Sequence, residues 1–129
     1  MSVKPTNSAS KEKIVLIVED DDDLRQIVQW MLEDEGFMVE TAKDGREALD
    51  RAMARKPSLV LLDMALPIID GYGVAAGLHE VYGDTITILA MTADGRAAEK
   101  AKYVGAIGYV SKPFELDTLV NAVRGALER

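Results

Sequence analysis

Short, largely apolar runs are the feature of this chain that most constrains its fold. They occupy residues 14–18, 58–62, 86–91 and 107–110, and they are rich in isoleucine, leucine and valine. A strand that is apolar along its whole length is typical of a parallel sheet covered on both faces. Residues 37–41 alternate between apolar and polar side chains instead, which indicates an edge strand.

Helical patterns separate these runs. The first is predicted to start at a cap on Asp21 or Asp22 and to end near Gly36, and the second to start at Asp44 and stop at Pro57. Three more are predicted over residues 72–82, 96–104 and 115–127, the first of them weakened by glycines. At about 100° per residue, the predicted inward-facing residues are Leu24, Ile27, Val28, Met31 and Leu32 of the first helix, Ala48, Leu49, Ala52 and Met53 of the second, and Leu116, Leu119, Val120, Val123 and Leu127 of the last.

This alternation predicts an α/β fold with a doubly wound, five-stranded parallel sheet and right-handed crossovers. Ligands of such sheets bind beyond the carboxyl ends of the strands, where the strand order reverses. We expect residues 1–12 to form a flexible tail and residues 13–129 to form one domain. The residues that directly follow each strand therefore matter most for function.

Composition excludes several classes of protein. The 129 residues contain no cysteine, so disulfides, thiolate metal sites and cysteine nucleophiles are absent. No apolar stretch approaches the length of a membrane span, and the first residues do not resemble a signal peptide, which favours the cytoplasm. The net charge of -7 disfavours direct binding to nucleic acid or to an anionic membrane and suits a cation or a basic partner.

Polar residues with complementary chemistry follow four of the predicted strands. Glu19 and Asp20 follow the first, Asp63 follows the run at 58–62, Thr92 follows the run at 86–91, and Lys112 lies just beyond the last. In a sheet with the order 2-1-3-4-5 these residues converge. Three carboxylates at about 4 Å repel by about 4 kcal/mol per pair at an effective dielectric of about 20, and Lys112 offsets only one charge. Oxygen ligands favour Mg2+, and a metal, a lysine and a hydroxyl around a nucleophilic carboxylate make a phosphoryl-transfer site.

Each of these residues also has an ordinary structural explanation. An acidic run at a helix start usually caps the helix, and this is the preferred interpretation of Asp22 and Asp23. Asp63, Thr92 and Lys112 would each be unremarkable alone. The combination at four strand ends is what favours a site.

Four stretches together resemble the receiver domain of two-component response regulators. They are residues 15–21, residues 61–67 with Asp70 and Gly71, residues 91–93 and residues 108–114. The resemblance extends from about Lys13 to the C-terminus. It implies a flavodoxin-like sheet in the order 2-1-3-4-5 and a protein whose only catalysis is its own phosphorylation and dephosphorylation.

The resemblance assigns a role to each residue of the site. Asp63 would accept a phosphoryl group from a histidine kinase or a histidine phosphotransfer protein. Mg2+ would be bound directly by Asp20, Asp63 and the backbone carbonyl of Ala65, and through water by Glu19. The phosphoryl oxygens would be bound by Lys112, the Thr92 hydroxyl and the Ala93 N–H. The Lys112–Pro113 bond is expected to be cis.

The resemblance also implies a conformational switch. Tyr109 would move inward when Thr92 is drawn to the phosphate, which would change the face formed by residues 96–104, 107–110 and 115–127. That face would control an output partner, and the family often uses it for homodimers. Ala65 and Asp94 occupy positions that tune the lifetime of the phosphate in the family, so the lifetime here is open.

Three alternatives remain at this point. The chain could be a phosphatase or phosphotransferase for other substrates, a docking module that works without phosphorylation, or a piece of a longer regulator or hybrid kinase. Trp30 lies off the apolar face of its helix, either flat on the surface or as an aromatic anchor for the kinase.

Overall fold

The computed structural model describes residues 13–93 and 95–128. The strands pair in parallel in the order β2-β1-β3-β4-β5, which confirms the predicted sheet. The predicted tail, residues 1–12, and Asp94 lie outside the described residues. The elements are β1 (Ile14–Val18), α2 (Asp22–Asp34), β2 (Met38–Ala42), α3 (Gly45–Ala54), β3 (Leu59–Asp63), α4 (Gly71–Tyr82), the 3-10 turn η1 (Gly83–Thr85), β4 (Ile88–Thr92), α5 (Ala97–Tyr103), β5 (Gly108–Ser111) and α6 (Leu116–Leu127).

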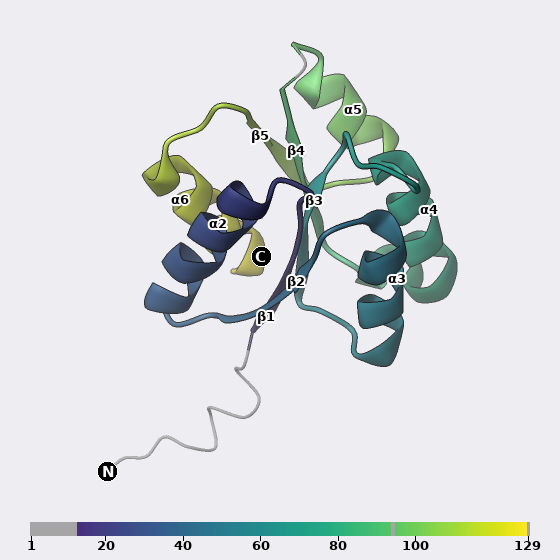
Figure 1. Cartoon of the computed structure of the whole chain (residues 1–129). Helices are drawn as coiled ribbons and strands as arrows, with labels where there is room; N and C mark the ends of the chain where they lie inside the picture. Colours follow the sequence, from purple (N-terminus) through teal and green to yellow (C-terminus); the bar gives the residue numbers. More distant parts are fainter. Residues whose placement is uncertain (1–12, 94, 129) are drawn as a thin grey trace.

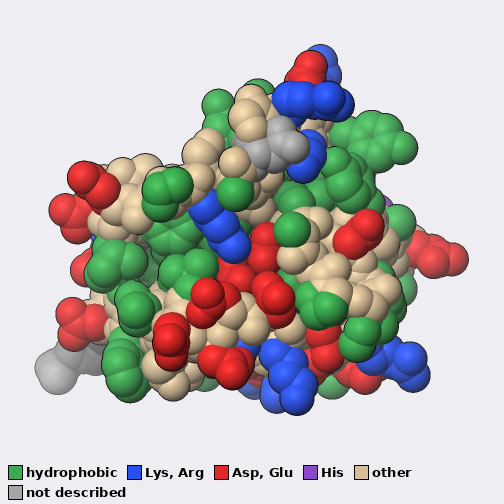
Figure 2. Space-filling view, turned by 45° about the horizontal axis from the view of Figure 1, so that its top comes forward, with side chains coloured by type: hydrophobic (Ala, Val, Ile, Leu, Met, Phe, Trp, Pro, Cys, Tyr) green, Lys and Arg blue, Asp and Glu red, His purple; other side chains and the backbone are tan. Residues whose placement is uncertain are grey.

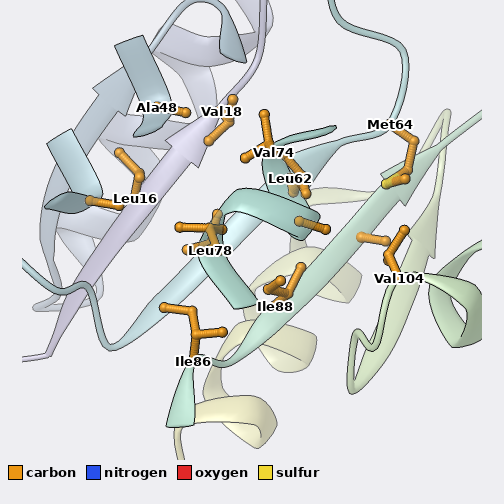
Figure 3. Close-up of a cluster of buried hydrophobic side chains, with 14 of the residues drawn as sticks. Leu16, Val18, Ala48, Leu62, Met64, Val74, Leu78, Ile86, Ile88 and Val104 are labelled. Carbon is orange, nitrogen blue, oxygen red and sulfur yellow. The ribbon is translucent and has the colours of Figure 1, made fainter. Parts of the chain in front are cut away.

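Helices cover both faces of the sheet. In Figure 1, α2 and α6 lie on one side and α3, α4 and α5 on the other. Successive strand residues point to opposite faces, so Val15 and Ile17 of β1 join one cluster of buried side chains and Leu16 and Val18 join the other. Figure 3 shows the second cluster, which includes residues of β1, β3, β4 and α4. Burial on both faces explains why β1, β3 and β4 are almost wholly apolar.

Acidic caps start three of the helices just beyond the strands. Asp21 accepts a hydrogen bond of 3.0 Å from the Leu24 N–H, and Asp44 accepts one of 2.8 Å from the Glu47 N–H. Asp70 caps α4 in the same way. These bonds satisfy backbone N–H groups that have no partner inside the helix. They confirm Asp21 and Asp44 as the caps predicted from the sequence.

For two residues the prediction of a buried side chain is wrong. Ile27 of α2 and Met53 of α3 are 44% and 43% exposed, whereas Val28 and Ala52 beside them are buried. Both lie at the margin of an apolar stripe that is wider in the sequence than the strip that the sheet covers.

The longest described helix, α2, has 13 residues, and no helix in the described ranges is long and apolar enough to cross a bilayer.

Close packing explains the glycines of α4. A Cβ added to Gly71 would lie 2.6 Å from the Cα of Met64 and 2.9 Å from the carbonyl oxygen of Asp63. One added to Gly77 would lie 2.9 Å from a methyl group of Leu49 on α3. Glycine disfavours a helix, but here it lets α4 approach its neighbours. At Gly71 the neighbour is rigid backbone, so α4 starts directly against the end of β3.

We predict opposite effects for two glycine-to-alanine changes. Gly71→Ala should lower the free energy of unfolding by about 1–3 kcal/mol, because the new methyl group overlaps backbone atoms. Gly125→Ala should raise it by about 0.5–1 kcal/mol, because Gly125 lies in α6 with open space around it. Urea unfolding of the two variants checks this, and equal effects would contradict the packing account.

Candidate functional site

The residues predicted to form a site lie along the carboxyl edge of the sheet. Glu19 and Asp20 directly follow β1, while Asp63 and Thr92 are the last residues of β3 and β4. Lys112 directly follows β5, and its N–H donates to the Thr92 carbonyl over 2.8 Å. The parallel registers therefore carry these side chains to one end of the molecule.

Three carboxylates form a tight cluster at this edge. One oxygen from each of Glu19, Asp20 and Asp63 lies within 4.8 Å of the others. Glu19 and Asp63 are 1% and 3% exposed, and Asp20 is exposed. Figure 2 shows acidic side chains gathered at this end, with a basic side chain against them and hydrophobic side chains to either side. An all-oxygen, strongly negative set of this kind fits a hard cation such as Mg2+.

Lys112 contacts this cluster. Its Nζ lies 2.7 Å from Oε1 of Glu19 and 3.4 Å from Oδ2 of Asp63. Burial alone would lower the pKa of Lys112, but the hydrogen bond to Glu19 and the charge of Asp63 outweigh it and raise that pKa. The lysine is therefore held as an ammonium ion directly beside Asp63.

Hydrogen bonds fix the orientation of both buried carboxylates. Oδ1 of Asp63 accepts from the Ala65 N–H over 3.1 Å, so Oδ2 is the oxygen turned toward Lys112. Oε2 of Glu19 accepts from the Asp21 N–H over 3.0 Å. Burial raises the pKa of Glu19, and the charge of Asp63 adds to the rise, while the bonds from Lys112 and Asp21 oppose it. Glu19 is thus a carboxylate whose ionised form the fold disfavours until further positive charge is present.

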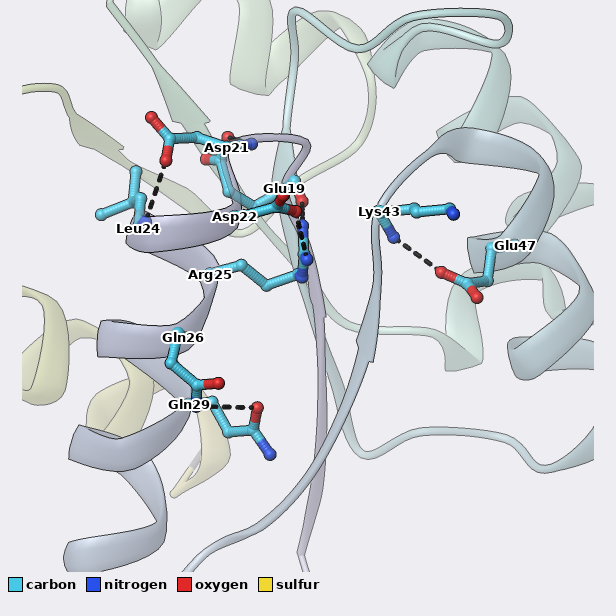
Figure 4. A network of polar contacts seen from close by, with 9 residues as sticks. All are labelled: Glu19, Asp21, Asp22, Leu24, Arg25, Gln26, Gln29, Lys43 and Glu47. Atoms are coloured by element: carbon cyan, nitrogen blue, oxygen red, sulfur yellow. Dashed lines mark hydrogen bonds and ion pairs between the residues drawn. The ribbon is translucent and has the colours of Figure 1, made fainter.

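Arg25 holds the loop that carries the acids, although it was not predicted from the sequence as a residue of the site. Its Nη1 donates to the Glu19 carbonyl over 2.9 Å, and its Nη2 lies 2.5 Å from Oδ1 of Asp22 (Figure 4). The bond to Asp22 spans three residues of α2, a spacing that favours ion pairs on helices. That spacing was visible in the sequence, but the contact with the Glu19 carbonyl depends on the turn of the loop.

The remaining predicted residues surround the cluster. Thr92 is 4% exposed at the end of β4, Ala93 is exposed, and the Lys112–Pro113 bond is cis as expected. Tyr109 of β5 is 47% exposed, so its inward movement stays a prediction. An apolar hollow of about 330 Å³ adjoins Lys112, lined also by Leu24, Ala93, Pro113 and Phe114.

We predict that Asp63→Asn stabilises the metal-free protein and removes its response to Mg2+. The change relieves repulsion with Glu19 and Asp20, so the free energy of unfolding should rise by on the order of 1 kcal/mol, since lost attraction to Lys112 offsets part of the gain. Mg2+ at about 100 times its Kd should add about 2.7 kcal/mol to the wild type and far less to the variant. Thermal melts with and without Mg2+ measure both effects, and a variant less stable than the metal-free wild type would contradict the charge account.

The raised pKa of Glu19 predicts a pH window for this response. The folded protein binds a proton on Glu19 more tightly than the unfolded chain does, so protonation of Glu19 stabilises the fold. This contribution to the free energy of unfolding is complete below the ordinary pKa of 4.5 and is lost as pH rises through the raised pKa. Because Mg2+ requires ionised carboxylates, its stabilising effect should shrink as pH falls through the same window. Melts between about pH 4 and pH 8 test this, and Glu19→Gln removes the titrating group as a control. A Mg2+ effect constant across the window would contradict it.

Comparisons with known proteins agree with this geometry. Residues 15–124 match the model of the response regulator receiver domain family. The response regulator MprA of Mycolicibacterium vanbaalenii is 38% identical over 117 residues, which cover 89% of this chain and 50% of MprA. The chain thus spans about half the length of the curated relatives it matches.

Solved structures extend the likeness to three dimensions. The chemotaxis response regulator CheY4 of Vibrio cholerae is 33% identical, with a TM-score of 0.83 over 91% of this chain and 100% of CheY4. The response regulator TrrA of Thermotoga maritima, solved in complex with Mg2+-BeF, is 31% identical, with a TM-score of 0.80 over 89% of this chain and 99% of TrrA. The topology, the acidic cluster and the match over residues 15–124 lead to one conclusion: the chain belongs to the receiver domain family of two-component response regulators.

Proposed function

We propose that Asp63 accepts a phosphoryl group from the phosphohistidine of a histidine kinase or a histidine phosphotransfer protein. The proposal rests on the groups that surround the Asp63 carboxylate. One oxygen is fixed by the Ala65 N–H, and the other is turned toward an ammonium group inside a cluster that suits a cation. This is the arrangement a nucleophilic carboxylate needs in phosphoryl transfer.

The transfer forms one bond and breaks another. A carboxylate oxygen of Asp63 attacks phosphorus, the bond from phosphorus to the histidine nitrogen breaks, and the imidazole leaves with the electron pair. Lys112 pairs with one phosphoryl oxygen, and the Thr92 hydroxyl and the Ala93 N–H donate to the others. Of these donors, Lys112 already lies beside Asp63, whereas the Thr92 hydroxyl would move toward the phosphoryl group.

Mg2+ fits the acidic residues of the site. Asp20, Asp63 and the Ala65 carbonyl are proposed as direct ligands, and Glu19 as a ligand through water. When bound, the ion neutralises negative charge on the carboxylates and on the transferring group. Glu19 and Lys112 hold each other in place, which keeps the ammonium group beside Asp63.

We further propose that the phosphoryl group acts as a signal rather than as an intermediate in turnover of another substrate. Thr92 would move toward the phosphate and Tyr109 would turn inward, which changes the face of α5, β5 and α6. That face would bind the output partner and, in some states, a second copy of the chain. We take residues 13–129 as the receiver unit. The residue types at positions 65 and 94 would tune how long the signal lasts, as they do in the family.

The donor protein would approach the carboxyl edge, where Asp63 is reached. Trp30 of α2 is 63% exposed, next to the exposed Ile27, and this pair is a proposed contact for that donor. Exposed acids at positions 20–23 favour a partner with basic side chains around its phosphohistidine.

We predict one phosphoryl adduct that depends on both Asp63 and Mg2+. Intact mass is measured after incubation with phosphoramidate, with and without Mg2+, for the wild type and Asp63→Asn. The wild type should gain the mass of one phosphoryl group only with Mg2+, and the variant should gain none. Asp84→Asn, which changes an exposed acid of η1 away from the carboxyl edge, serves as the control that should still be modified.

The contrary results are also informative. An adduct on Asp63→Asn would move the acceptor to another residue. A wild type that stays unmodified, although Mg2+ raises its melting temperature, would favour a docking module that works without phosphorylation.

A further inference from the structure

Ile68 has a backbone conformation that its side chain disfavours. Its φ is 69°, and it is the only non-glycine residue with a positive φ among residues 13–93 and 95–128. The left-handed region places Cβ too close to the following carbonyl oxygen, and a β-branched residue there is a clear outlier. Glycine or asparagine would adopt the same backbone with less strain.

Burial of the Ile68 side chain does not compensate for this strain. The Ile68 side chain is 80% exposed, whereas Leu66 in the same loop is 8% exposed. The loop itself is fixed: the Ile69 carbonyl lies against Gly45, and the Gly71 N–H donates to the Met64 carbonyl over 3.3 Å. The loop therefore imposes the left-handed conformation, and the large apolar side chain at its tip gains no burial from it.

The position of the loop shows where that side chain can act. Residues 64–70 connect Asp63 to α4, so Ile68 belongs to a loop at the carboxyl edge, and the loops around the acidic cluster form the rim of the site. Across Lys112, the rim carries the apolar hollow formed with Leu24, Pro113 and Phe114. Because Asp63 is only 3% exposed, a protein that brings a phosphohistidine to it must cover this rim. A small phosphodonor can reach Asp63 without covering the rim.

We infer that Ile68 is a specificity-determining contact for the phosphohistidine-bearing protein, held ready in a strained conformation so that it enters an apolar depression on that partner. The inference rests on the proposed function and names the partner's surface: an apolar depression for Ile68 and basic side chains for the acids at positions 20–23. Strain kept at an exposed position is typical of sites that bind a ligand or a partner. A side chain that becomes fully desolvated in a well-packed pocket of a partner can contribute strongly to affinity.

The test compares two donors on matched variants. Ile68→Asn keeps a residue that tolerates the left-handed backbone and removes the apolar group. Val81→Asn makes the same change at a β-branched residue that is 54% exposed near the other end of α4. Phosphoramidate with Mg2+ is the small donor. The protein donor is whichever member of a panel of purified, ATP-phosphorylated histidine kinases and phosphotransfer proteins transfers fastest to the wild type.

We expect Ile68→Asn to raise the melting temperature, to leave the phosphoramidate rate unchanged, and to lower kcat/KM for the protein donor by about tenfold, mainly through KM. Val81→Asn should leave both phosphorylation rates unchanged. Unchanged transfer from the protein donor to Ile68→Asn would overturn the inference, as would an equal loss with both donors or a lower melting temperature. Modification by phosphoramidate but by no protein of the panel would also count against it. A wild type modified by neither donor would instead overturn the proposed function.

Discussion

The balance of charge around Asp63 is the interaction on which the rest of this molecule depends. Three carboxylates lie within 4.8 Å of one another, two of them almost fully buried, and one lysine contacts the cluster. Burial and the charge of Asp63 raise the pKa of Glu19, although the bonds from Lys112 and Asp21 oppose the rise, so one lysine only partly offsets the repulsion among the three acids. A divalent cation or a bound phosphoryl group changes that balance sharply. A site with this sensitivity to charge is well suited to convert a chemical modification into a change of structure.

The parallel sheet is what makes the charge cluster possible. The strands β1, β3 and β4, which lead to the three carboxylates and Thr92, are buried by helices on both faces, so close packing of the core holds their carboxyl ends in place. Caps on Asp21, Asp44 and Asp70 start helices directly after the loops at that edge. The start of α4 is tied further to the end of β3 by the contact at Gly71. The site thus stands on rigid elements, and the loop after β3 holds the exposed Ile68 side chain in a fixed backbone conformation.

Much of the fold and of the acidic cluster could be predicted from the sequence, because the patterns that indicate them lie within short stretches of the chain. Apolar runs mark β1, β3 and β4, and in a parallel sheet the residues after such runs must share an edge. Glu19, Asp20, Asp63 and Lys112 were therefore expected together, and they lie together. The helix caps follow from residue type and position in the same way.

What could not be predicted depends on contacts between distant parts of the chain or on backbone angles. The glycines of α4 look only like a weak helix until Met64 and Leu49 are seen against them. Ile27 and Met53 fit an apolar helix face, yet the sheet does not reach them. Arg25 binds the Glu19 carbonyl because of how one loop turns. The strain at Ile68 has no signature in the sequence, since isoleucine is usual in extended strands and rare at a positive φ.

The most direct test of the central claim is a crystal structure with Mn2+ in place of Mg2+ and with beryllofluoride as a stand-in for the phosphoryl group. Our account predicts anomalous density for one ion between Asp20, Asp63 and the Ala65 carbonyl, with the beryllofluoride on Asp63 and in contact with Lys112 and Thr92. An ion bound elsewhere, or beryllofluoride attached to a different carboxylate, would contradict it.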